Sequence, residues 1–211
     1  MDSEAKSKVR SQKSEAKGRE KVSTLTAKAE LRGRGVVLRP LRKSDGDGLF
    51  RHIRDPKIAR WLLNLPQPYR RKDMDEFLKR ALKATRSGQR HPFTIRWADS
   101  DEPIGLVELM RHPAGMPGAE IGYWLARPFW GKGIMTQAVK LLIAYGFDTL
   151  KLHRLSVGHL EPNDVSRRVI EKCWFRREGM SREALFRRGK WVNIVNYGLL
   201  EPEYRRIRNL D

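Results

Sequence analysis

The chain has 211 residues, of which 39% are hydrophobic and 33% are charged, and its formal net charge is +19. This length and composition predict one globular domain with an ordinary core, and no apolar run approaches the 18 residues expected of a transmembrane helix. The polar N-terminus predicts no secretory signal, and the single cysteine, Cys173, excludes an internal disulfide. We therefore expect a cytoplasmic protein without a membrane partner.

Residues 1–33 are rich in Lys, Glu, Ser and Ala and nearly free of large apolar side chains, which predicts a disordered or transiently helical basic arm. We expect a single domain at residues 34–206 and a tail at 207–211. Lysines and arginines are also in excess outside the arm. The charge favours proximity to a ribosome or RNA, and the alternative is that it serves only solubility.

In the first half of the chain, hydrophobic periodicity predicts a strand, three helices and two strands, at residues 36–39, 44–55, 58–65, 73–86, 93–98 and 104–110. Pro56 is expected to end the first helix, and Pro66 and Pro68 the second. Gly88 is expected to close the third. A turn is predicted at 99–102.

In the second half, a hairpin loop at 112–118 precedes a strand at 119–126 and a long amphipathic helix. The apolar face of that helix carries Val139, Leu142, Ile143, Phe147 and Leu150. A strand, a helix and two further strands are predicted at 154–158, 164–173, 182–187 and 191–200. Early helices, hairpin-linked strands and a final strand–helix alternation predict an α+β protein with a mixed sheet.

The segment that joins the strand at 119–126 to the long helix contains two close glycines, Gly131 and Gly133. Glycine lets backbone N–H groups approach a ligand, and the unpaired donors of a helix N-terminus suit a phosphate. Lys132 adds a cation. The segment therefore predicts a phosphate-binding turn, although a plain strand-to-helix turn would read similarly.

Two segments together resemble the GNAT superfamily of acyl-CoA-dependent N-acetyltransferases, most closely its ribosomal-protein N-terminal (RimJ/RimL-type) branch. That branch typically reads I-G-Y-W-L-x-P-x-x-W-G-K-G-Y-A-T-E-A and later E-N-x-x-S-x-R-V-L-E-K-L-G-F. Here residues 121–138 read IGYWLARPFWGKGIMTQA and residues 161–175 read EPNDVSRRVIEKCWF. Met135 stands where a small residue is expected, and Ile170 stands where the wider superfamily often has a tyrosine acid.

The resemblance implies a mixed, mostly antiparallel sheet of about seven strands, splayed between strands four and five and flanked by about four helices. It also implies acetyl-CoA as cosubstrate. The pantetheine arm is expected along the backbone of Trp124, Leu125 and Ala126. The pyrophosphate is expected at the backbone N–H groups of Trp130, Gly131, Lys132, Gly133, Ile134, Met135 and Thr136. The five histidines lack metal-ligand spacing, so no metal site is predicted.

Catalytic roles follow from the same resemblance. Glu120 is the candidate base, with Glu108 on the neighbouring strand as its competitor. Ser166 matches the serine proposed as the acid for the leaving thiolate, and Asn163 matches an asparagine that hydrogen-bonds near the cofactor. Each has a purely structural alternative: a surface charge for Glu120, packing for Ser166 and an N-cap for Asn163. By analogy, Trp61, Tyr69 and the loop at 64–72 border the acceptor groove.

The predicted function is acetyl transfer from acetyl-CoA to a primary amine, with the N-terminal α-amine of a protein as the first candidate. A small amine, such as an amino acid, aminoglycoside or polyamine, is the alternative, and a polyamine is disfavoured because a basic protein repels a polycation. A different class of function is a non-catalytic, CoA-sensing or RNA-associated module on the same fold. We expect a monomer or a homodimer.

Overall fold

The computed structural model describes residues 30–63, 65–97, 100–113 and 115–210. Most of the predicted arm lies outside these residues, as does Asp99 of the predicted turn. The strands are β1 Leu31–Gly33, β2 Val36–Pro40, β3 Arg90–Trp97, β4 Pro103–Arg111, β5 Gly118–Leu125, β6 Arg154–Leu160, β7 Arg176–Arg187 and β8 Lys190–Leu200. The α-helices are α2 Gly46–Ile53, α3 Pro56–Ala59, α4 Arg71–Arg86, α5 Ile134–Ala144, α6 Asp164–Lys172 and α7 Glu201–Arg208. Short helical turns η1 and η2 span Lys43–Asp45 and Arg127–Phe129, and the π-helical turn η3 spans Tyr145–Thr149.

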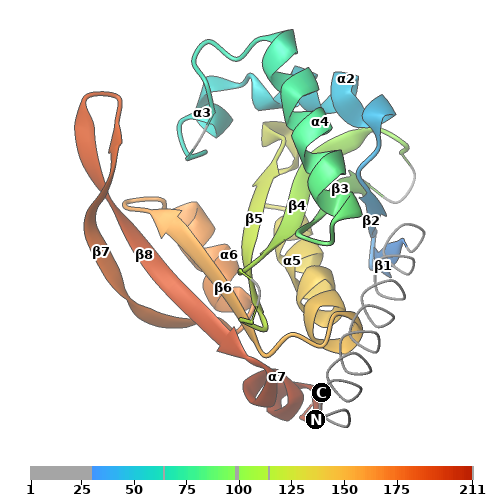
Figure 1. The fold of residues 1–211 in the computed structure, drawn as a ribbon, viewed down its shortest axis with the longest axis vertical. Helices are drawn as coiled ribbons and strands as arrows, with labels where there is room; N and C mark the ends of the chain where they lie inside the picture. The colour runs from blue at the N-terminus through green and yellow to red at the C-terminus, as the bar shows by residue number, and fades with distance from the viewer. Residues whose placement is uncertain (1–29, 64, 98–99, 114, 211) are drawn as a thin grey trace, which may run out of the picture.

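The eight strands form one sheet in the order β1-β2-β3-β4-β5-β6-β8-β7, so the fold is the expected α+β arrangement on a mixed sheet (Figure 1). Every neighbouring pair is antiparallel except β5 and β6. That parallel pair is joined over only three residue pairs, from Gly118 opposite Arg154 to Glu120 opposite Ser156. Beyond them the strands diverge, which is the expected splay between the fourth and fifth predicted strands.

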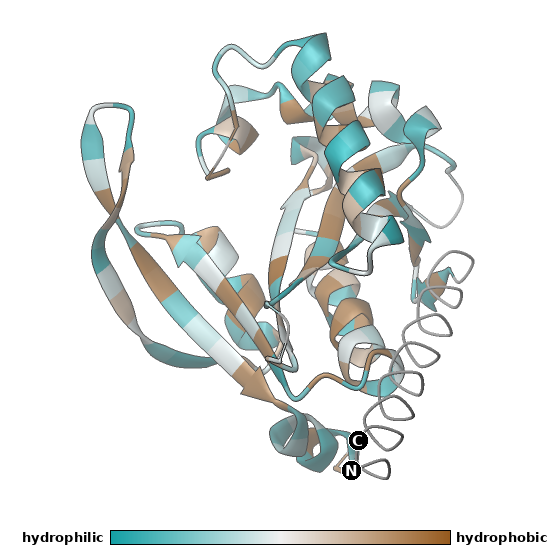
Figure 2. Cartoon of the chain, in the orientation of Figure 1, coloured by the Kyte–Doolittle hydropathy of each residue, from teal (hydrophilic) through white to brown (hydrophobic). Residues whose placement is uncertain are grey.

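Helices cover both faces of the sheet, and the alternation of strand side chains decides which residue goes to which layer. Leu106 and Trp124 pack in the layer with α2 and α4, whereas their neighbours Val107 and Leu125 pack in the layer with α5. In Figure 2, α5 is largely apolar where it crosses the sheet, and α4 shows a mostly hydrophilic outer face. Strand β5 contributes to both layers, so it is covered on both faces, and the layer with α5 continues over β6 and β8.

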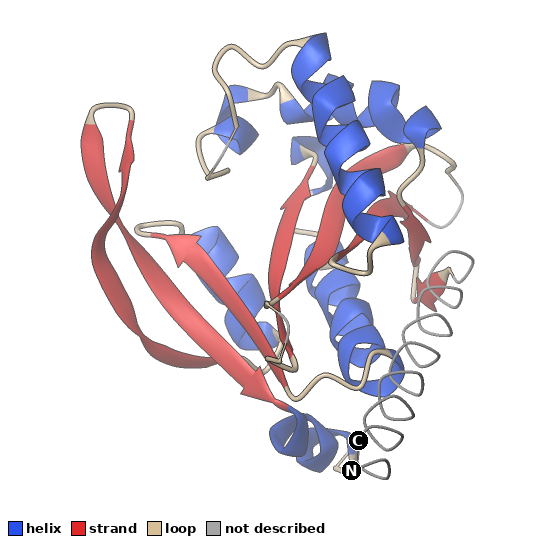
Figure 3. Cartoon of the chain, viewed as in Figure 1, coloured by secondary structure: helices blue, strands red, loops and turns tan. Residues whose placement is uncertain are grey.

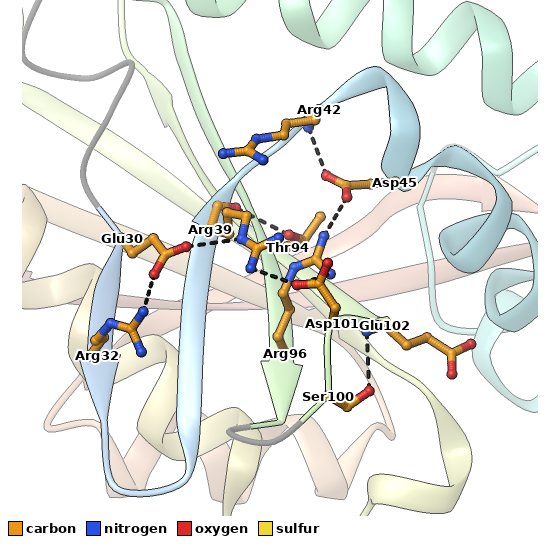
Figure 4. Close-up of polar contacts among 10 residues, drawn as sticks. All are labelled: Glu30, Arg32, Arg39, Arg42, Asp45, Thr94, Arg96, Ser100, Asp101 and Glu102. Atoms are coloured by element: carbon orange, nitrogen blue, oxygen red, sulfur yellow. Dashed lines mark hydrogen bonds and ion pairs between the residues drawn. The ribbon is translucent and has the colours of Figure 1, made fainter.

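A network of ion pairs holds the first helices to the outer part of the sheet (Figure 4). The Asp45 carboxylate accepts hydrogen bonds from the backbone N–H of Arg42 and from the guanidinium of Arg96, and the side chains of Asp45 and Arg96 are each only 4% exposed. Arg39 pairs with Glu30 and Asp101. Because a buried charge is costly without a partner, the Asp45–Arg96 pair fixes how η1 and α2 dock on β3.

Most predicted elements are present, with two corrections in the first half. The helix predicted at 58–65 is wrong: α3 is one turn that begins at Pro56, because the Asp55 carboxylate accepts a hydrogen bond from the N–H of Lys57 and caps it. Pro56 is therefore the first residue of α3, and the preceding helix α2 ends earlier, at Ile53. The predicted helix start at Asp73 is two residues late, since Asp73 is the third residue of α4 and binds back to the N–H of Arg70.

Other differences are extensions and omissions. The last two strands are longer than predicted and form a hairpin that projects from the rest of the sheet (Figure 3). Strand β1 lies within the range assigned to the arm, and α7 ends at Arg208, inside the predicted tail. Neither β1 nor α7 was predicted, because a three-residue strand and a helix with one buried residue, Tyr204, carry little hydrophobic pattern.

Candidate active site

A cavity of about 1060 Å³ opens where β5 and β6 diverge. Its walls come from the α3–α4 region, β4, the part of β5 from Glu120 onward, the turn before α5, and α6 with the facing parts of β6 and β8. The cavity therefore runs between the two halves of the sheet.

The turn before α5 has the geometry of an anion site. Gly131 and Gly133 have φ of 77° and 76°, a left-handed conformation that glycine adopts without strain. A Cβ added at either position would meet no other atom within 4 Å. Gly133 is the N-cap of α5, so the first N–H groups of this eleven-residue helix are free to face the cavity. The indole N–H of Trp130 donates to the carbonyl of Leu125 at 2.7 Å and fixes the entry into the turn.

The cavity brings together most of the residues predicted for the cofactor: Trp124, Leu125, Trp130, Gly131, Gly133, Ile134, Met135, Thr136 and Asn163. Ala126 and Lys132 do not line it. Ala126 is fully buried and its N–H donates to the carbonyl of Ile104, so that group is already used. The Lys132 amine lies 5.6 Å from the centre of the Phe129 ring. Met135 is 7% exposed and packs in the core.

The two candidate bases stand on neighbouring strands and differ in their partners. Both oxygens of Glu108 accept hydrogen bonds from the Arg90 guanidinium, and Glu108 is 7% exposed. Glu120 also lines the cavity and is exposed. Among the described residues, its carboxylate forms no hydrogen bond or ion pair within the protein. Glu120 thus keeps its lone pairs available, whereas Arg90 occupies those of Glu108.

Asn163, Ser166 and Tyr123 form a small polar group on the α6 side of the cavity. Asn163 is the N-cap of α6, and its side-chain oxygen accepts a hydrogen bond from the N–H of Ser166 at 3.2 Å. The hydroxyls of Ser166 and Tyr123 lie 2.7 Å apart. Burial raises the pKa of the Tyr123 phenol well above its usual 10, so this hydroxyl stays protonated.

Tyr123 and Arg90 are site residues that the sequence analysis did not single out. Tyr123 lies inside the quoted segment at 121–138, but an alternating strand does not say which of its aromatic side chains ends beside a distant helix. Arg90 begins a strand that was predicted to start at Phe93. Ile170, at the position of the wider superfamily's tyrosine, is 1% exposed and offers no proton.

The end of the cavity nearest α3 and α4 combines aromatic and basic side chains. Its lining includes Trp61, Tyr69, Phe77, Arg60, Arg80 and Arg90. Burial, followed by the charge of Asp73, raises the pKa of Tyr69 to about 12. Arg187, from the β7–β8 hairpin, donates to the backbone carbonyls of Ala59 and Arg60 and so ties the hairpin to the end of α3.

Within the described ranges, no group of three or more His, Cys, Asp or Glu residues is arranged to hold a metal ion. In the same part of the chain, no helix has the length and apolarity needed to cross a membrane.

Comparison with known proteins identifies the family. Residues 36–176 match the model of the acetyltransferase (GNAT) domain, so the chain belongs to the GNAT acetyltransferases. It is 34% identical over 181 residues to the probable N-acetyltransferase YjcK of Bacillus subtilis, covering 82% of this chain and 98% of that protein. It is 43% identical over 100 residues to the putative ribosomal N-acetyltransferase YdaF of the same organism, covering 47% and 55%.

Among solved structures, Mycobacterium smegmatis RimJ in complex with CoA-disulfide superimposes with a TM-score of 0.73 at 25% identity, covering 86% of this chain and 93% of that one. The chain is therefore an N-acetyltransferase of the GNAT fold, and acetyl-CoA is its cosubstrate. The free N–H groups at the start of α5 suit the diphosphate of CoA, and the splay between β5 and β6 offers its long arm a path.

Proposed function

We propose that this acetyltransferase modifies the N-terminal α-amine of a protein, of the type found on ribosomes. The relative YdaF carries a ribosomal designation, and the chain's net charge of +19 suits a partner that is rich in RNA. We further propose that the protein works in the cytoplasm.

The observation that carries the proposal is the basic character of the acceptor end of the cavity. Arg60, Arg80 and Arg90 line this end, and the Glu108 carboxylate is already paired with Arg90. A polyamine brings several positive charges into this surrounding and is repelled, whereas a peptide brings one amine followed by a neutral, hydrogen-bonding backbone. The aromatic side chains Trp61 and Tyr69 offer a surface on which the first peptide residues can pack.

The lower pKa of an α-ammonium group also favours an α-amine over lysine as the acceptor. An amine attacks only when it is neutral, and with ordinary pKa values of about 8 for an α-amine and about 10.4 for lysine, roughly a tenth of the former and under a thousandth of the latter is neutral at pH 7. We propose that Glu120 takes the proton that the amine loses, directly or through a water molecule.

Acetyl-CoA supplies an activated thioester whose carbonyl carbon accepts the amine. We propose that Ser166 donates a proton to the departing sulfur. We also propose that Asn163 holds Ser166 in place, because the Asn163 side-chain oxygen accepts a hydrogen bond from the Ser166 backbone N–H. A thiol has a pKa near 8.5 by analogy with cysteine, so the departing group needs only a weak acid.

The test is acetyl transfer from acetyl-CoA to a panel of peptides that differ in their first three residues, followed by mass spectrometry. Each peptide is paired with an N-terminally blocked copy that contains one lysine, and spermidine is included. We expect mass gain on free N-termini, much less on the blocked lysine peptides and least on spermidine. Preferred acetylation of spermidine or of the blocked lysine peptides would contradict the proposal.

A further inference from the structure

Two hydroxyl groups meet on the α6 side of the cavity, and only one of them has a role so far. Tyr123 reaches from the middle of β5 to Ser166 in α6, with their oxygens 2.7 Å apart. The same phenol lies 3.4 Å from the backbone carbonyl of Ser166. Both residues line the cavity. The Ser166 residue is therefore contacted at its N–H by Asn163 and at its carbonyl and hydroxyl by Tyr123.

The chemistry of the two hydroxyls gives this hydrogen bond a direction. A phenol is a stronger acid than an aliphatic alcohol, and the phenolic oxygen lies closer to Ser166 Oγ, at 2.7 Å, than to the Ser166 carbonyl, at 3.4 Å. The favoured arrangement therefore has the single Tyr123 O–H donating to Ser166 Oγ. That arrangement leaves the hydrogen of Ser166 free to point elsewhere. A hydroxyl that accepts one hydrogen bond becomes a better donor in the next, because the bonds polarise each other.

We propose that Tyr123 is a positioning residue, which holds the Ser166 hydroxyl as a donor toward the sulfur of the acetyl donor. This inference rests on the proposed role of Ser166. In the transfer step, the amine nitrogen bonds to the thioester carbonyl carbon and the carbon–sulfur bond breaks. The sulfur leaves with the electron pair and takes the Ser166 proton, which solvent replaces, while the amine proton goes to Glu120. Tyr123 keeps its own proton throughout.

The groups around this pair leave the hydrogen bond intact over a wide pH range. Cys173 and Tyr197 act electrostatically on the Tyr123 phenol, and burial raises the pKa of Cys173 to about 12. His159, Arg168 and Lys172 line the same cavity from β6 and α6, and Glu120 lines it from β5. Neither Tyr123→Phe nor Ser166→Ala changes any of these groups, so the wild type measured in the same buffers is the background for the comparison.

The first experiment measures the ligand, without turnover. CoA and desulfo-CoA are titrated into the full-length protein by calorimetry between pH 6 and 9, and the thiolate absorbance of bound CoA gives the pKa of its thiol. In the wild type, a donor aimed at the sulfur favours the thiolate, so the pKa of the bound thiol should lie below that of free CoA measured in the same buffers. We expect Tyr123→Phe to raise it by about one unit, a tenfold change in the thiolate equilibrium. We expect Ser166→Ala to raise it at least as far.

Tyr145→Phe is the matched control. Tyr145 is another buried tyrosine whose hydroxyl has a partner, the Nδ1 of His91 at 3.2 Å, and it does not line the cavity. The Tyr145→Phe substitution should leave the pKa of the bound CoA thiol unchanged. Thermal unfolding verifies that each variant is folded. If Tyr123→Phe is unstable, Ser166→Ala still tests whether the Ser166 hydroxyl donates to the sulfur.

The second experiment separates positioning from independent action. If Tyr123 works through Ser166, Tyr123→Phe should lower kcat about three- to tenfold with little change in the KM for acetyl-CoA. The double variant should then match Ser166→Ala alone. Multiplicative losses, or a bound thiol pKa that Tyr123→Phe leaves unchanged, would overturn the inference while the proposed function stands. Failure of the wild type to bind CoA would overturn both.

Discussion

At the scale of single residues, Gly133 offers the sharpest test of the cofactor site. A Cβ added at Gly133 meets no other atom within 4 Å, so a side chain there starts toward the place proposed for the diphosphate, although the positive φ of 76° strains most residues other than glycine. We expect Gly133→Asp to keep the fold and to weaken CoA binding by at least a hundredfold. Gly133→Asn has the same shape without the charge and tolerates this backbone conformation, so it should weaken binding much less. Calorimetry with both variants decides, and equal CoA affinity in the wild type and Gly133→Asp would remove the diphosphate from this turn.

Glu120 can be tested by removing only its basicity. Glu120→Gln should lower turnover at neutral pH by about 100- to 10,000-fold, the range typical of a lost general base. Part of the loss should return as the pH rises, because the acceptor amine then loses its proton unaided. Glu108→Gln is the comparison, since Arg90 already engages that carboxylate. A larger kcat loss in Glu108→Gln than in Glu120→Gln would reverse the assignment.

The same scale shows which part of the site could be read from the sequence. The glycine turn and the segment from Asn163 to Ser166 are continuous stretches with a local geometry, and the structure brings both to the cavity. The pairing of Glu108 with Arg90, and of Tyr123 with Ser166, joins residues 18 and 43 positions apart. Such pairings depend on strand register and helix docking, which no local pattern specifies.

At the scale of elements, long helices and hydrophobic strands were predicted where packing repeats at a regular spacing, as in α4, α5 and β4. The sequence was least informative where a single contact decides the structure. Helix α3 exists because one aspartate caps it, and the outer half of the β7–β8 hairpin is held to α3 by one arginine, Arg187. Neither contact produces a repeating hydrophobic pattern in the sequence, so neither could be predicted from it.

Strand β3 carries a buried histidine that should make stability depend on pH. Burial lowers the pKa of His91 from 6.5 to about 4, and its side chain is 3% exposed. The folded state therefore keeps His91 neutral while the unfolded state takes up a proton, so stability is lost as the pH falls from about 6.5 to about 4. The loss is about 3 kcal/mol at most.

The measurement is denaturant unfolding of the wild type and His91→Phe at pH 7 and pH 4.5. The variant removes the titrating group and should lose less stability between the two values. An equal loss in both proteins would assign the acid sensitivity to other groups.

At the scale of the whole molecule, the positive charge is distributed over both the arm and the folded part. Because β1 pairs with β2 and Glu30 pairs with Arg39, a truncation that tests the arm should stop before residue 30. We expect removal of residues 1–29 to leave acetyl transfer to a short peptide within about threefold. Binding to ribosomes should weaken and become less sensitive to salt, since fewer cations then displace counterions.

Co-sedimentation of both forms with ribosomes over a salt series gives the comparison, and a deletion that also removes Leu31–Gly33 is the control for damage to the sheet. Absence of ribosome binding by either form at low salt would favour a small amine as the acceptor.

The three residue pairs between β5 and β6 have a mechanical consequence. They are the hydrogen-bonded strand pairing between two half-sheets, β1 to β5 and β6 to β8, so relative motion of the halves is opposed mainly by side-chain packing. We expect a donor bound along the divergent strands to contact both halves at once and to act as a cross-link between them. Saturating CoA should therefore raise the unfolding temperature, with about 2.7 kcal/mol gained at a hundred times the dissociation constant. Exchange of the backbone amide hydrogens should slow most along the open edge of β5. The substrate would then stiffen the connection between the two half-sheets of the enzyme that uses it.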